Sequence, residues 1–453
     1  MRINILSLNA KGDGKTLNTK IIQRACDECA KRGGGTIIIP EGRFLTGHFV
    51  IGSYTTLYIE KGGVLLSSPK LEDHIYEEKP AGLIFAKNAK KIVIKGKGII
   101  DGQPEPFFDF TQDHDAGDPI PVKNFTRSQD GPVKPLKRPG NLIVLSCCSN
   151  FLIEDIKIRG SSYWTIHIAD STDGKIRNVT IEHDQRIPNN DGIHITNSKK
   201  IIIRGCKITT GDDCIAISGW TKPKSEPEIH LGFSAKDNPS KDIKVSRCIL
   251  SSRSAAIRVW TNETDVCNVK FSNIIINNSN RGIGVFSRGK GKISNISFKN
   301  FRITTRYHQG RWWGKAEPIH ISSIPVEEDV MSGEIENISF KNIKATSENG
   351  IVIYSFLKGL IKKVLLSNIR LTLKPGNNTI ANTGLLDLRP VRTDLKGEVP
   401  KEIRPLIAEK IDTLEIKDFS VNIKTDSNEK YKLNPSFEEV QNIVIKKYSE
   451  NKE

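Results

Sequence analysis

A short pattern of hydrophobic and polar positions recurs along most of the chain. Two hydrophobic residues flank one other residue, a polar pair follows, and a further hydrophobic residue closes the unit, as in residues 151–156, 243–248, 296–301 and 338–343. The closing residues fall at positions 156, 179, 206, 248, 274, 301, 343 and 369, so successive steps are 23, 27, 42, 26, 27, 42 and 26 residues. Strands repeating at about this interval are typical of a β-solenoid, in which each coil lies on the one before.

The 42-residue steps contain either an additional coil with a degenerate pattern or an insertion at one corner. A β-sandwich is the alternative for so many short strands, but it would show a hairpin turn about every 8–12 residues. Asn-Gly and Asp-Gly pairs do not separate the strands at that spacing. We therefore predict an all-β fold, a parallel β-helix.

Asparagine stands at the corner of five units, where it suits a turn with left-handed backbone angles and can form an amide ladder. These corner residues are Asn178, Asn273, Asn300, Asn342 and Asn368.

The two ends of the chain break the pattern. Residues 18–31 carry apolar residues at positions 21, 22, 25 and 29 and precede three glycines, which predicts a short N-terminal helix. A helix there would cap the open end of the solenoid, which otherwise presents unpaired strand edges. We expect one β-helix domain over residues 1–425. Residues 426–453 are expected to form a charged C-terminal tail, with a short helix that begins near Pro435.

The chain of 453 residues carries 68 Lys and Arg against 52 Asp and Glu, a net charge of +16. This excess suggests an acidic partner, and an acidic polysaccharide suits a long solenoid groove. Lysines that merely solvate exposed turns would give the same count. A nucleic acid partner is not expected, because no recognition helix, RNP signature or zinc-finger spacing occurs.

The sequence contains no apolar run long enough to cross a membrane, and its amino terminus lacks the basic-apolar-small order of a secretory signal. We expect a cytoplasmic protein without a membrane partner, although a secreted chain already freed of its signal would look the same. The oligomeric state is left open. No cofactor or metal ion is expected, because the CxxC pair of Cys26 and Cys29 lies in the expected helix, outside the βαβ context of a redox motif.

Two acidic segments, residues 189–195 and 210–217, lie one repeat apart. Sliding the second segment back by 22 residues places Asp213 on Asp191, and the alternating isoleucines mark both segments as strands. Adjacent strands lie about 4.8 Å apart, so Asp191, Asp212 and Asp213 are expected to converge on the outside of the coil. Because Asp212 and Asp213 would point to opposite faces of a regular strand, we expect an irregular corner there.

Three crowded carboxyl groups resist joint ionisation, so at least one pKa should rise. Glycoside hydrolysis needs one protonated carboxyl group to donate to the leaving oxygen and one ionised group to take a proton from water. A network of turn contacts and a calcium site are the alternatives for the same aspartates.

Several motifs resemble those of glycoside hydrolase family 28, the polygalacturonase family. Residues 188–192 (Pro-Asn-Asn-Asp-Gly) and 211–213 (Gly-Asp-Asp) resemble the family's Asn-Thr-Asp and Gly-Asp-Asp motifs. Further similar stretches are residues 10–15, 98–103 and 162–167. The resemblance covers about residues 5–305 and implies an inverting hydrolase of pectin-type poly- or oligosaccharides on a right-handed parallel β-helix. By motif position, Asp212 would be the general acid, and Asp191 and Asp213 would hold the attacking water.

The chain departs from the family where a galacturonate carboxylate would be gripped. Arg253 stands in place of the histidine of the family's Gly-His-Gly motif, and Gly284 and Phe286 stand in place of the basic residues of its Arg-Ile-Lys motif. A related backbone such as rhamnogalacturonan therefore becomes more attractive than plain polygalacturonate. Four nearby arginines could form a substitute fork for a carboxylate: Arg253, Arg258, Arg281 and Arg288.

Three more residues are candidates for substrate binding. His167 and His194 lie close to the acidic segments, and His194 alternates with buried isoleucines. Trp313 sits in a glycine-flanked loop, where its flat ring could stack on a sugar. The long segments 103–140, 221–240 and 374–405 are expected to wall the groove; closed walls would give an exo-acting pocket and open walls an endo-acting cleft.

Two other classes of function remain open. A β-helix polysaccharide lyase would use calcium and an arginine base and would release an unsaturated, ultraviolet-absorbing product. A non-catalytic carbohydrate-binding solenoid, such as a tailspike-like adhesin, would bind without turnover.

Overall fold

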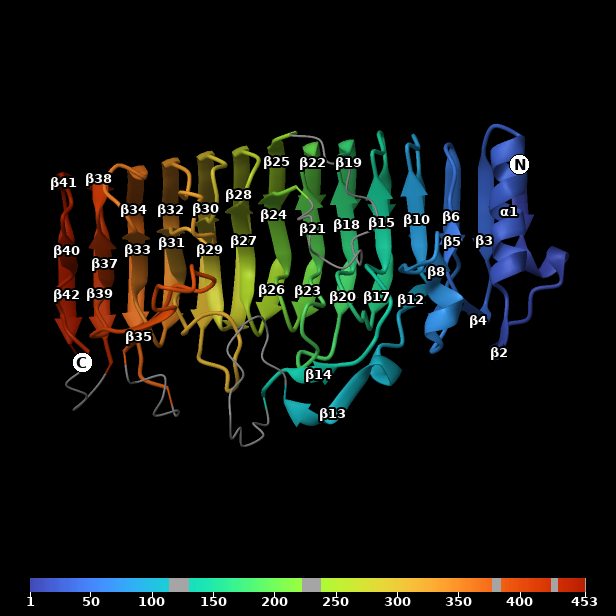
Figure 1. The fold of residues 1–453 in the computed structure, drawn as a ribbon, viewed down its shortest axis with the longest axis horizontal. Helices are drawn as coiled ribbons and strands as arrows, with labels where there is room; N and C mark the ends of the chain where they lie inside the picture. The colour runs from blue at the N-terminus through green and yellow to red at the C-terminus, as the bar shows by residue number, and fades with distance from the viewer. Residues whose placement is uncertain (114–129, 222–237, 377–383, 425–430, 453) are drawn as a thin grey trace.

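The computed structural model describes residues 1–113, 130–221, 238–376, 384–424 and 431–452. The chain forms a rod of stacked coils, with the N terminus at one end and the C terminus at the other (Figure 1). Strands of successive coils pair in parallel within two long sheets, one of 24 strands and one of 12. The predicted parallel β-helix is confirmed.

The 12-stranded sheet runs along one side of the rod. Its strands are β5 (Phe49–Val50), β10 (Ile84–Lys87), β15 (Ile143–Ser146), β18 (Ile166–Ala169), β21 (Ile193–Thr196), β24 (Ile215–Gly219), β27 (Ala255–Thr261), β29 (Arg281–Ser287), β31 (Ile319–Ser323), β33 (Ile351–Ser355), β37 (Leu406–Glu409) and β40 (Ser436–Glu438).

The 24-stranded sheet bends at a corner, so most coils contribute two segments to it. The first series contains β3 (Gly35–Ile39), β6 (Thr55–Ile59), β11 (Val93–Gly96), β16 (Leu152–Glu154), β19 (Thr172–Arg177), β22 (Lys199–Arg204), β25 (Ser240–Ser246), β38 (Ile411–Ile416) and β41 (Asn442–Ile445). The second series contains β4 (Gly42–Thr46), β7 (Gly63–Ser67), β12 (Ile99–Asp101), β17 (Lys157–Arg159), β20 (Thr180–Glu182), β23 (Lys207–Thr210), β26 (Ile249–Ser252), β39 (Phe419–Ile423) and β42 (Tyr448–Lys452). Four long strands span both series: β28 (Val266–Ser279), β30 (Ile293–Thr305), β32 (Ile335–Ser347) and β34 (Ile361–Leu373). The sheet also includes β1 (Arg2–Asn4) and β2 (Asp13–Leu17).

Both 42-residue steps of the sequence contain insertions rather than an additional coil. The first insertion lies between β24 and β25, and the second step has connections on both sides of β31. Register is preserved across them, because β23 still pairs with β26 and β30 with β32.

The interior is a continuous stack of aliphatic and aromatic side chains. Phe271, Phe298 and Phe340 occupy equivalent positions in three coils, with ring centroids 4.8 and 4.7 Å apart. At the bend, Asn300 donates to Asn273 at 3.0 Å and accepts from Asn342 at 2.9 Å. The corner asparagines have positive φ, so the predicted amide ladder is confirmed.

Helix α1 (Thr19–Lys31) covers the N-terminal end of the rod, as predicted (Figure 1). Its buried face presents Ile22, Ala25, Cys26 and Cys29 to the first coils.

The prediction of a C-terminal tail with a short helix is wrong. The segment after Pro435 forms strands rather than a helix, because β40, β41 and β42 pair in parallel with β37, β38 and β39. The repeat therefore runs past residue 425 to Lys452. The alternation that forms this coil is weak in the sequence, since Ile443, Val444 and Ile445 are consecutive apolar residues and remain 38–47% exposed at the open end.

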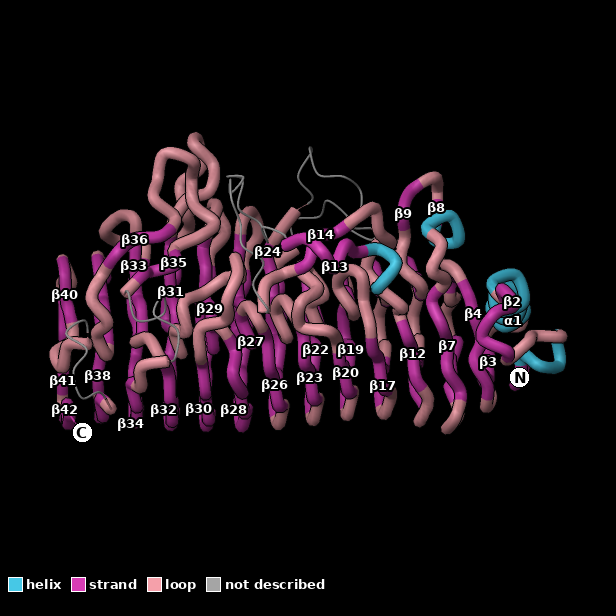
Figure 2. The backbone as a smooth tube through the Cα atoms, turned by 90° about the horizontal axis from the view of Figure 1, so that it is seen from below, coloured by secondary structure: helices cyan, strands magenta, loops and turns pink. Residues whose placement is uncertain are grey.

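Among the described residues, three small hairpins and three short 3-10 helices project from the rod, mainly on the side of the 12-stranded sheet (Figure 2). The hairpins are β8–β9 (Ile75–Tyr76 and Lys79–Pro80), β13–β14 (Phe108–Asp113 and Val133–Pro135) and β35–β36 (Leu385–Asp387 and Glu398–Pro400). The 3-10 helices are η1 (Ile5–Leu8), η2 (Leu71–His74) and η3 (Glu105–Phe107). None of the described helices is long and apolar enough to cross a membrane.

Candidate active site

Asp191 and Asp213 occupy equivalent positions in adjacent coils, each two residues before a strand of the 12-stranded sheet. The register of β21 and β24 pairs Ile193 with Ile215, and both isoleucines belong to the hydrophobic core. The carboxyl group of Asp191 instead contacts the ring of His194, with His194 Nδ1 3.1 Å from Asp191 Oδ2. The two aspartates therefore lie on the outer side of the coil.

Asp212 joins this pair through an irregular corner. Residues 211–214 belong to no strand, and the side-chain oxygen of Asn190 accepts from the backbone N–H of Gly211 at 2.7 Å and of Asp212 at 3.2 Å. The hydroxyl groups of Thr210 and Ser252 donate to the Asp212 carbonyl at 2.5 and 2.6 Å. These contacts fix the turn that the sequence predicts between two neighbouring aspartates.

The acid cluster of Asp191, Asp212 and Asp213 is almost fully buried, with exposed fractions of 3%, 4% and 1%. Burial raises the pKa of all three carboxyl groups, and for Asp191 the charges of the other two add to the rise. The pKa of Asp213 rises to about 7, although the guanidinium of Arg258 opposes that rise. Nη1 of Arg258 lies 3.3 Å from Asp213 Oδ2. The cluster therefore retains protons at a pH where ordinary carboxyl groups have lost theirs.

A row of positions on the outer side of the 12-stranded sheet runs beside the acid cluster along the rod, and we call it the groove floor after the groove that the sequence predicts. Strand register places its members in consecutive coils: His167, His194, Ala216, Arg258, Gly284 and His320. Trp164 stacks on His194 with ring centroids 3.7 Å apart, and the guanidinium of Arg258 lies 4.9 Å from the centre of the Trp260 ring. The acid cluster and the floor beside it therefore combine carboxyl groups, the cation of Arg258 and flat rings, the side chains that suit an acidic sugar.

Comparison with known proteins agrees with this geometry. The family described as glycosyl hydrolases family 28 matches residues 29–384, which is more than half of the chain. The chain belongs to glycosyl hydrolase family 28. Its motifs had indicated the same family.

Individual relatives are distant. A probable polygalacturonase from Vitis vinifera is 29% identical over 326 residues, and the match covers 67% of this chain and 60% of the grape protein. An exo-poly-alpha-D-galacturonosidase from Dickeya chrysanthemi is 32% identical over 266 residues, which cover 50% of this chain and 44% of that protein. The solved family 28 exopolygalacturonase of Yersinia enterocolitica is similar in fold, with a TM-score of 0.69, 18% identity, and coverage of 98% of this chain and 78% of that one.

In this family 28 chain, only one of the four arginines proposed as a carboxylate fork contacts the acid cluster. That residue is Arg258. Arg281 is buried and pairs with Glu317 at 2.9 Å, and its Nη2 donates to the Asp387 carbonyl. Arg288 is also buried and donates to the Ser322 hydroxyl at 3.0 Å, as well as to backbone carbonyls. Both buried arginines flank the ring of Phe286.

Arg253 connects the segment 103–140 to the loop between β30 and β31 instead of facing the cluster. Its Nη1 lies 2.5 Å from His308 Nδ1, and its Nη2 lies 3.2 Å from Asp130. Trp312 Nε1 donates to the Asp130 carbonyl at 2.7 Å, so the same aspartate anchors the loop around Trp312. The half-buried ring of Trp313 lies 5.2 Å from the Arg389 guanidinium.

Arg138 is a neighbour of the cluster that sequence reasoning missed. It donates to the carbonyls of Ser162 and Pro188 and, at 2.9 Å, to Asn189 Oδ1. Burial lowers its pKa to about 10, while the nearby Tyr163 and the acid cluster oppose that change. Arg138 lies in a long irregular segment, where no periodic pattern marks functional positions. The one available signal was that it is a basic residue shortly before a strand of the 12-stranded sheet.

His167 lies one coil from His194, as the repeat implies, but deeper. Its Nε2 lies 3.1 Å from the Thr196 hydroxyl, its Nδ1 lies 3.1 Å from Asn141 Nδ2, and the ring is fully buried. It therefore supports the Trp164 and His194 stack from below. Over the described ranges, no group of three or more His, Cys, Asp or Glu is arranged to hold a metal ion.

Proposed function

We propose that the protein hydrolyses glycosidic bonds of galacturonate-containing pectic poly- or oligosaccharides. The observation that carries the proposal is the buried cluster of Asp191, Asp212 and Asp213 beside Arg258, on the outer face of the β-helix. Membership of family 28 and the names of its galacturonan-cleaving relatives support the choice of substrate class.

We assign the chemical roles by surroundings and motif position. Asp212, whose pKa is raised by burial, donates its proton to the leaving glycosidic oxygen as the bond to the anomeric carbon breaks. Asp213, whose negative charge is stabilised by Arg258, acts with Asp191 to hold a water molecule and take its proton as the water oxygen bonds to that carbon. Attack from the face opposite the leaving group inverts the anomeric configuration.

Product configuration tests this assignment. Proton NMR of the first product formed from a defined oligosaccharide should show inversion at the new reducing end. Retention would contradict it and would make one aspartate a covalent nucleophile. An unsaturated, ultraviolet-absorbing product would instead select the lyase reaction.

We further infer exo action, because both ends of the groove floor are covered. Beyond His320 the same row continues with Val352 and Ile407, and both pack under Leu386 and Leu388 at the β35–β36 hairpin. On the other side of His167 the row continues with Val144 and Phe85, and the Phe85 ring lies 5.4 Å from Tyr76 of the β8–β9 hairpin. A floor closed at both ends suits a pocket that accepts a chain end.

The preferred unit in that pocket is proposed to differ from plain polygalacturonate. Gly284 and Phe286 supply no cation, and Arg281 and Arg288 are committed to other contacts. Arg258 is then the one floor cation beside the cluster, and it already pairs with Asp213, while Arg138 already donates to Ser162, Pro188 and Asn189. A carboxylate buried without a partner is costly, so rhamnogalacturonan fragments should fit the scissile position better than oligogalacturonates.

A panel of pectic oligosaccharides with product analysis tests both points. Rhamnogalacturonan fragments should be cleaved faster than oligogalacturonates of equal length, with release of one terminal unit per turnover. Faster cleavage of oligogalacturonates would overturn the specificity, and early appearance of mid-sized fragments would overturn exo action.

A further inference from the structure

The outer face of the larger sheet carries cations that oppose one another. In register, Lys244 of β25 lies opposite Lys270 of β28, and on β30 and β32 Lys299 lies opposite Lys341 and Arg302 opposite Lys344. All six side chains are exposed, and none forms an ion pair with a described residue. We call these six residues the cationic stripe. The strands that carry them lie side by side along the rod (Figure 1).

The same sheet arranges its charges differently in the flanking coils. Glu154 lies opposite Arg177 and bonds to it at 2.9 Å, and Asp101 lies opposite Arg159 at 2.8 Å. Towards the C terminus, Arg370 pairs with Asp418 at 2.8 Å. Ion pairs therefore compensate part of the charge on both sides of the stripe, although Arg177 also lies opposite Arg204 and Lys199 opposite Lys241.

The stripe has no such compensation within its own strands. β28 and β30 contain no carboxylate, β25 contains Asp242 and β32 contains Glu336. Asp242 accepts from Asn268 at 3.3 Å, and Glu336 pairs with Lys292 at 2.6 Å. Neighbouring strands lie about 4.8 Å apart, and like charges at opposed positions are destabilising. The free chain thus bears a repulsion that an anionic ligand would relieve.

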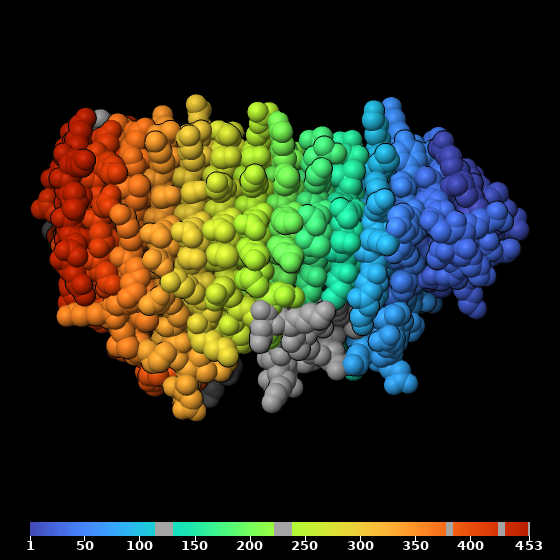
Figure 3. Space-filling view, turned by 90° about the horizontal axis from the view of Figure 1, so that it is seen from above, coloured from blue at the N-terminus to red at the C-terminus, as the bar shows by residue number. Residues whose placement is uncertain are grey.

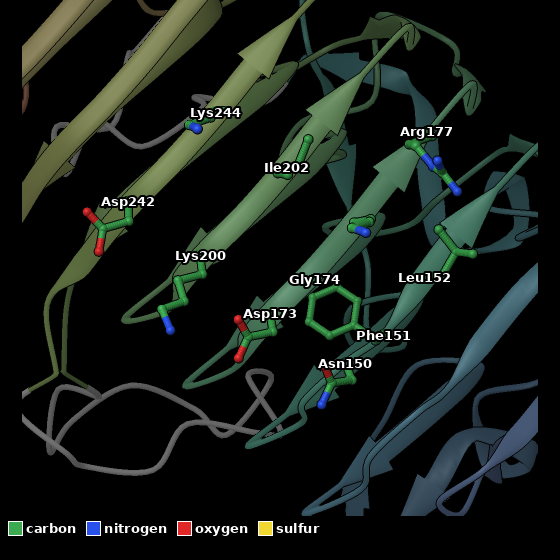
Figure 4. Close-up of a pocket in the computed structure, with 11 residues that line it drawn as sticks. Asn150, Phe151, Leu152, Asp173, Gly174, Arg177, Lys200, Ile202, Asp242 and Lys244 are labelled. Carbon is green, nitrogen blue, oxygen red and sulfur yellow. The ribbon is translucent and has the colours of Figure 1, made fainter.

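The surface around the stripe suits an extended polar ligand. A shallow depression of about 590 Å³ lies on this surface, and Lys200, Ile202 and Lys244 line it across neighbouring strands (Figure 4). A second depression of about 490 Å³ lies at the bend beside Arg302 and Lys344. The coils form ribs across the rod axis (Figure 3), so a ligand lying along the axis would cross one coil after another and would meet Lys244 and Lys270 in adjacent coils.

We propose that the cationic stripe binds a segment of carboxylate-bearing polysaccharide outside the groove. The choice of polymer rests on the proposed function, since a chain held along the outer sheet would keep its end near the groove. Single-stranded nucleic acid is the weaker candidate, because its binding sites present aromatic platforms, and no exposed aromatic ring is present among the described residues of β25, β28, β30 and β32.

Retention on immobilised polygalacturonate tests the proposal. The stripe variant replaces Lys244, Lys270, Lys299 and Lys344 by serine, a residue that already stands in the same rows at 272, 297 and 339. The control replaces Lys11, Lys15, Lys61 and Lys70, four exposed lysines near the N-terminal end, and so removes the same charge.

The stripe variant should elute at lower salt and bind roughly tenfold more weakly, since it loses four weak exposed ion pairs. The control should elute close to the wild type. Turnover of an oligosaccharide short enough to lie within the groove should be the same in all three proteins.

Equal retention of the stripe variant and the control would overturn the proposal. Stripe-dependent binding of RNA or of anionic vesicles, without binding of polygalacturonate, would overturn the polysaccharide assignment. If no pectic oligosaccharide is hydrolysed but stripe-dependent retention persists, the proposed function fails and the stripe proposal stands.

Discussion

At the residue scale, the three aspartates differ in their partners. Asp213 is paired with Arg258, whereas the Oδ2 of Asp212 accepts from the backbone and side-chain nitrogens of Asn189 at 3.3 and 3.4 Å. Burial raises the pKa of Asp212, whereas the charge of Arg258 and the backbone N–H of Asn189 oppose that rise.

Asp212→Asn should reduce turnover by about 10²-fold or more, because an amide keeps the volume but cannot donate the acid proton. Turnover and binding of a pectic oligosaccharide should be measured together, and binding should remain close to that of the wild type. Asp155→Asn is the matched control: Asp155 is exposed at a corner with a φ of 55°, a conformation that asparagine accepts readily. Turnover of Asp212→Asn within a few-fold of the control would remove Asp212 from the acid role.

Asp191→Asn should raise the midpoint of thermal unfolding at pH 7. The folded-state pKa of Asp191 is raised, first by burial and then by its two acidic neighbours, so the folded state binds a proton more tightly than the unfolded state does. The contribution of that proton to stability is fully present below the pKa of the aspartate in the unfolded state, about 4. It is lost as the pH rises through the pKa of Asp191 in the folded state.

Thermal unfolding followed between pH 4 and pH 8 checks this prediction. The midpoint of the wild type should fall over that range relative to the variant, with a gain for the variant of about 1–2 °C at pH 7. A variant that is less stable than the wild type at pH 7 would show that the charge on Asp191 is stabilising in the native state.

Sequence reasoning located the acid cluster because one repeat separates its two segments. It could not determine what the arginines do, because their partners come from insertions that follow no period. Glu317 and Asp387, which engage Arg281, lie 36 and 106 residues further along the chain, and Asp130 lies 123 residues before Arg253.

At the scale of elements, the strands and corners were predictable where two constraints coincide. The central coils combine alternating hydrophobic residues with a corner asparagine, and Asn300 marks such a corner with a φ of 61°. The last coil lacks this combination, since Asn442 begins β41 instead of following a polar pair at the bend. Pairing with the preceding coil therefore determines its strands.

The β35–β36 hairpin belongs to the same scale, because tertiary contacts hold it over the groove floor. Replacing residues 385–400 by a short Gly-Ser linker should uncover Val352 and Ile407 and open that end of the floor. The variant should cleave bonds away from chain ends, so the viscosity of a pectic polymer should fall faster per bond broken. Unchanged release of terminal units would show that the hairpin does not define the exo pocket.

At the scale of the whole molecule, each coil contacts only its neighbours, so stability is expected to vary along the rod. One interior row shows this in a single series, from Ile338 through Val364 and Leu414 to Ile443. Ile338 is 1% exposed in the middle, whereas Ile443 is 38% exposed in the last described coil.

Replacing isoleucine by alanine should therefore lower the free energy of unfolding by different amounts at Ile338 and at Ile443. Ile338→Ala leaves a cavity between two covering coils and should lower the free energy of unfolding by about 2–5 kcal/mol. Ile443→Ala removes a side chain that is already partly hydrated and should cost under about 1 kcal/mol. Denaturant unfolding measures both, and turnover should be unchanged in either folded variant because the acid cluster lies in other coils. Equal costs would mean that further structure covers the last coil and that the exposed Ile443 side chain is buried in the working protein.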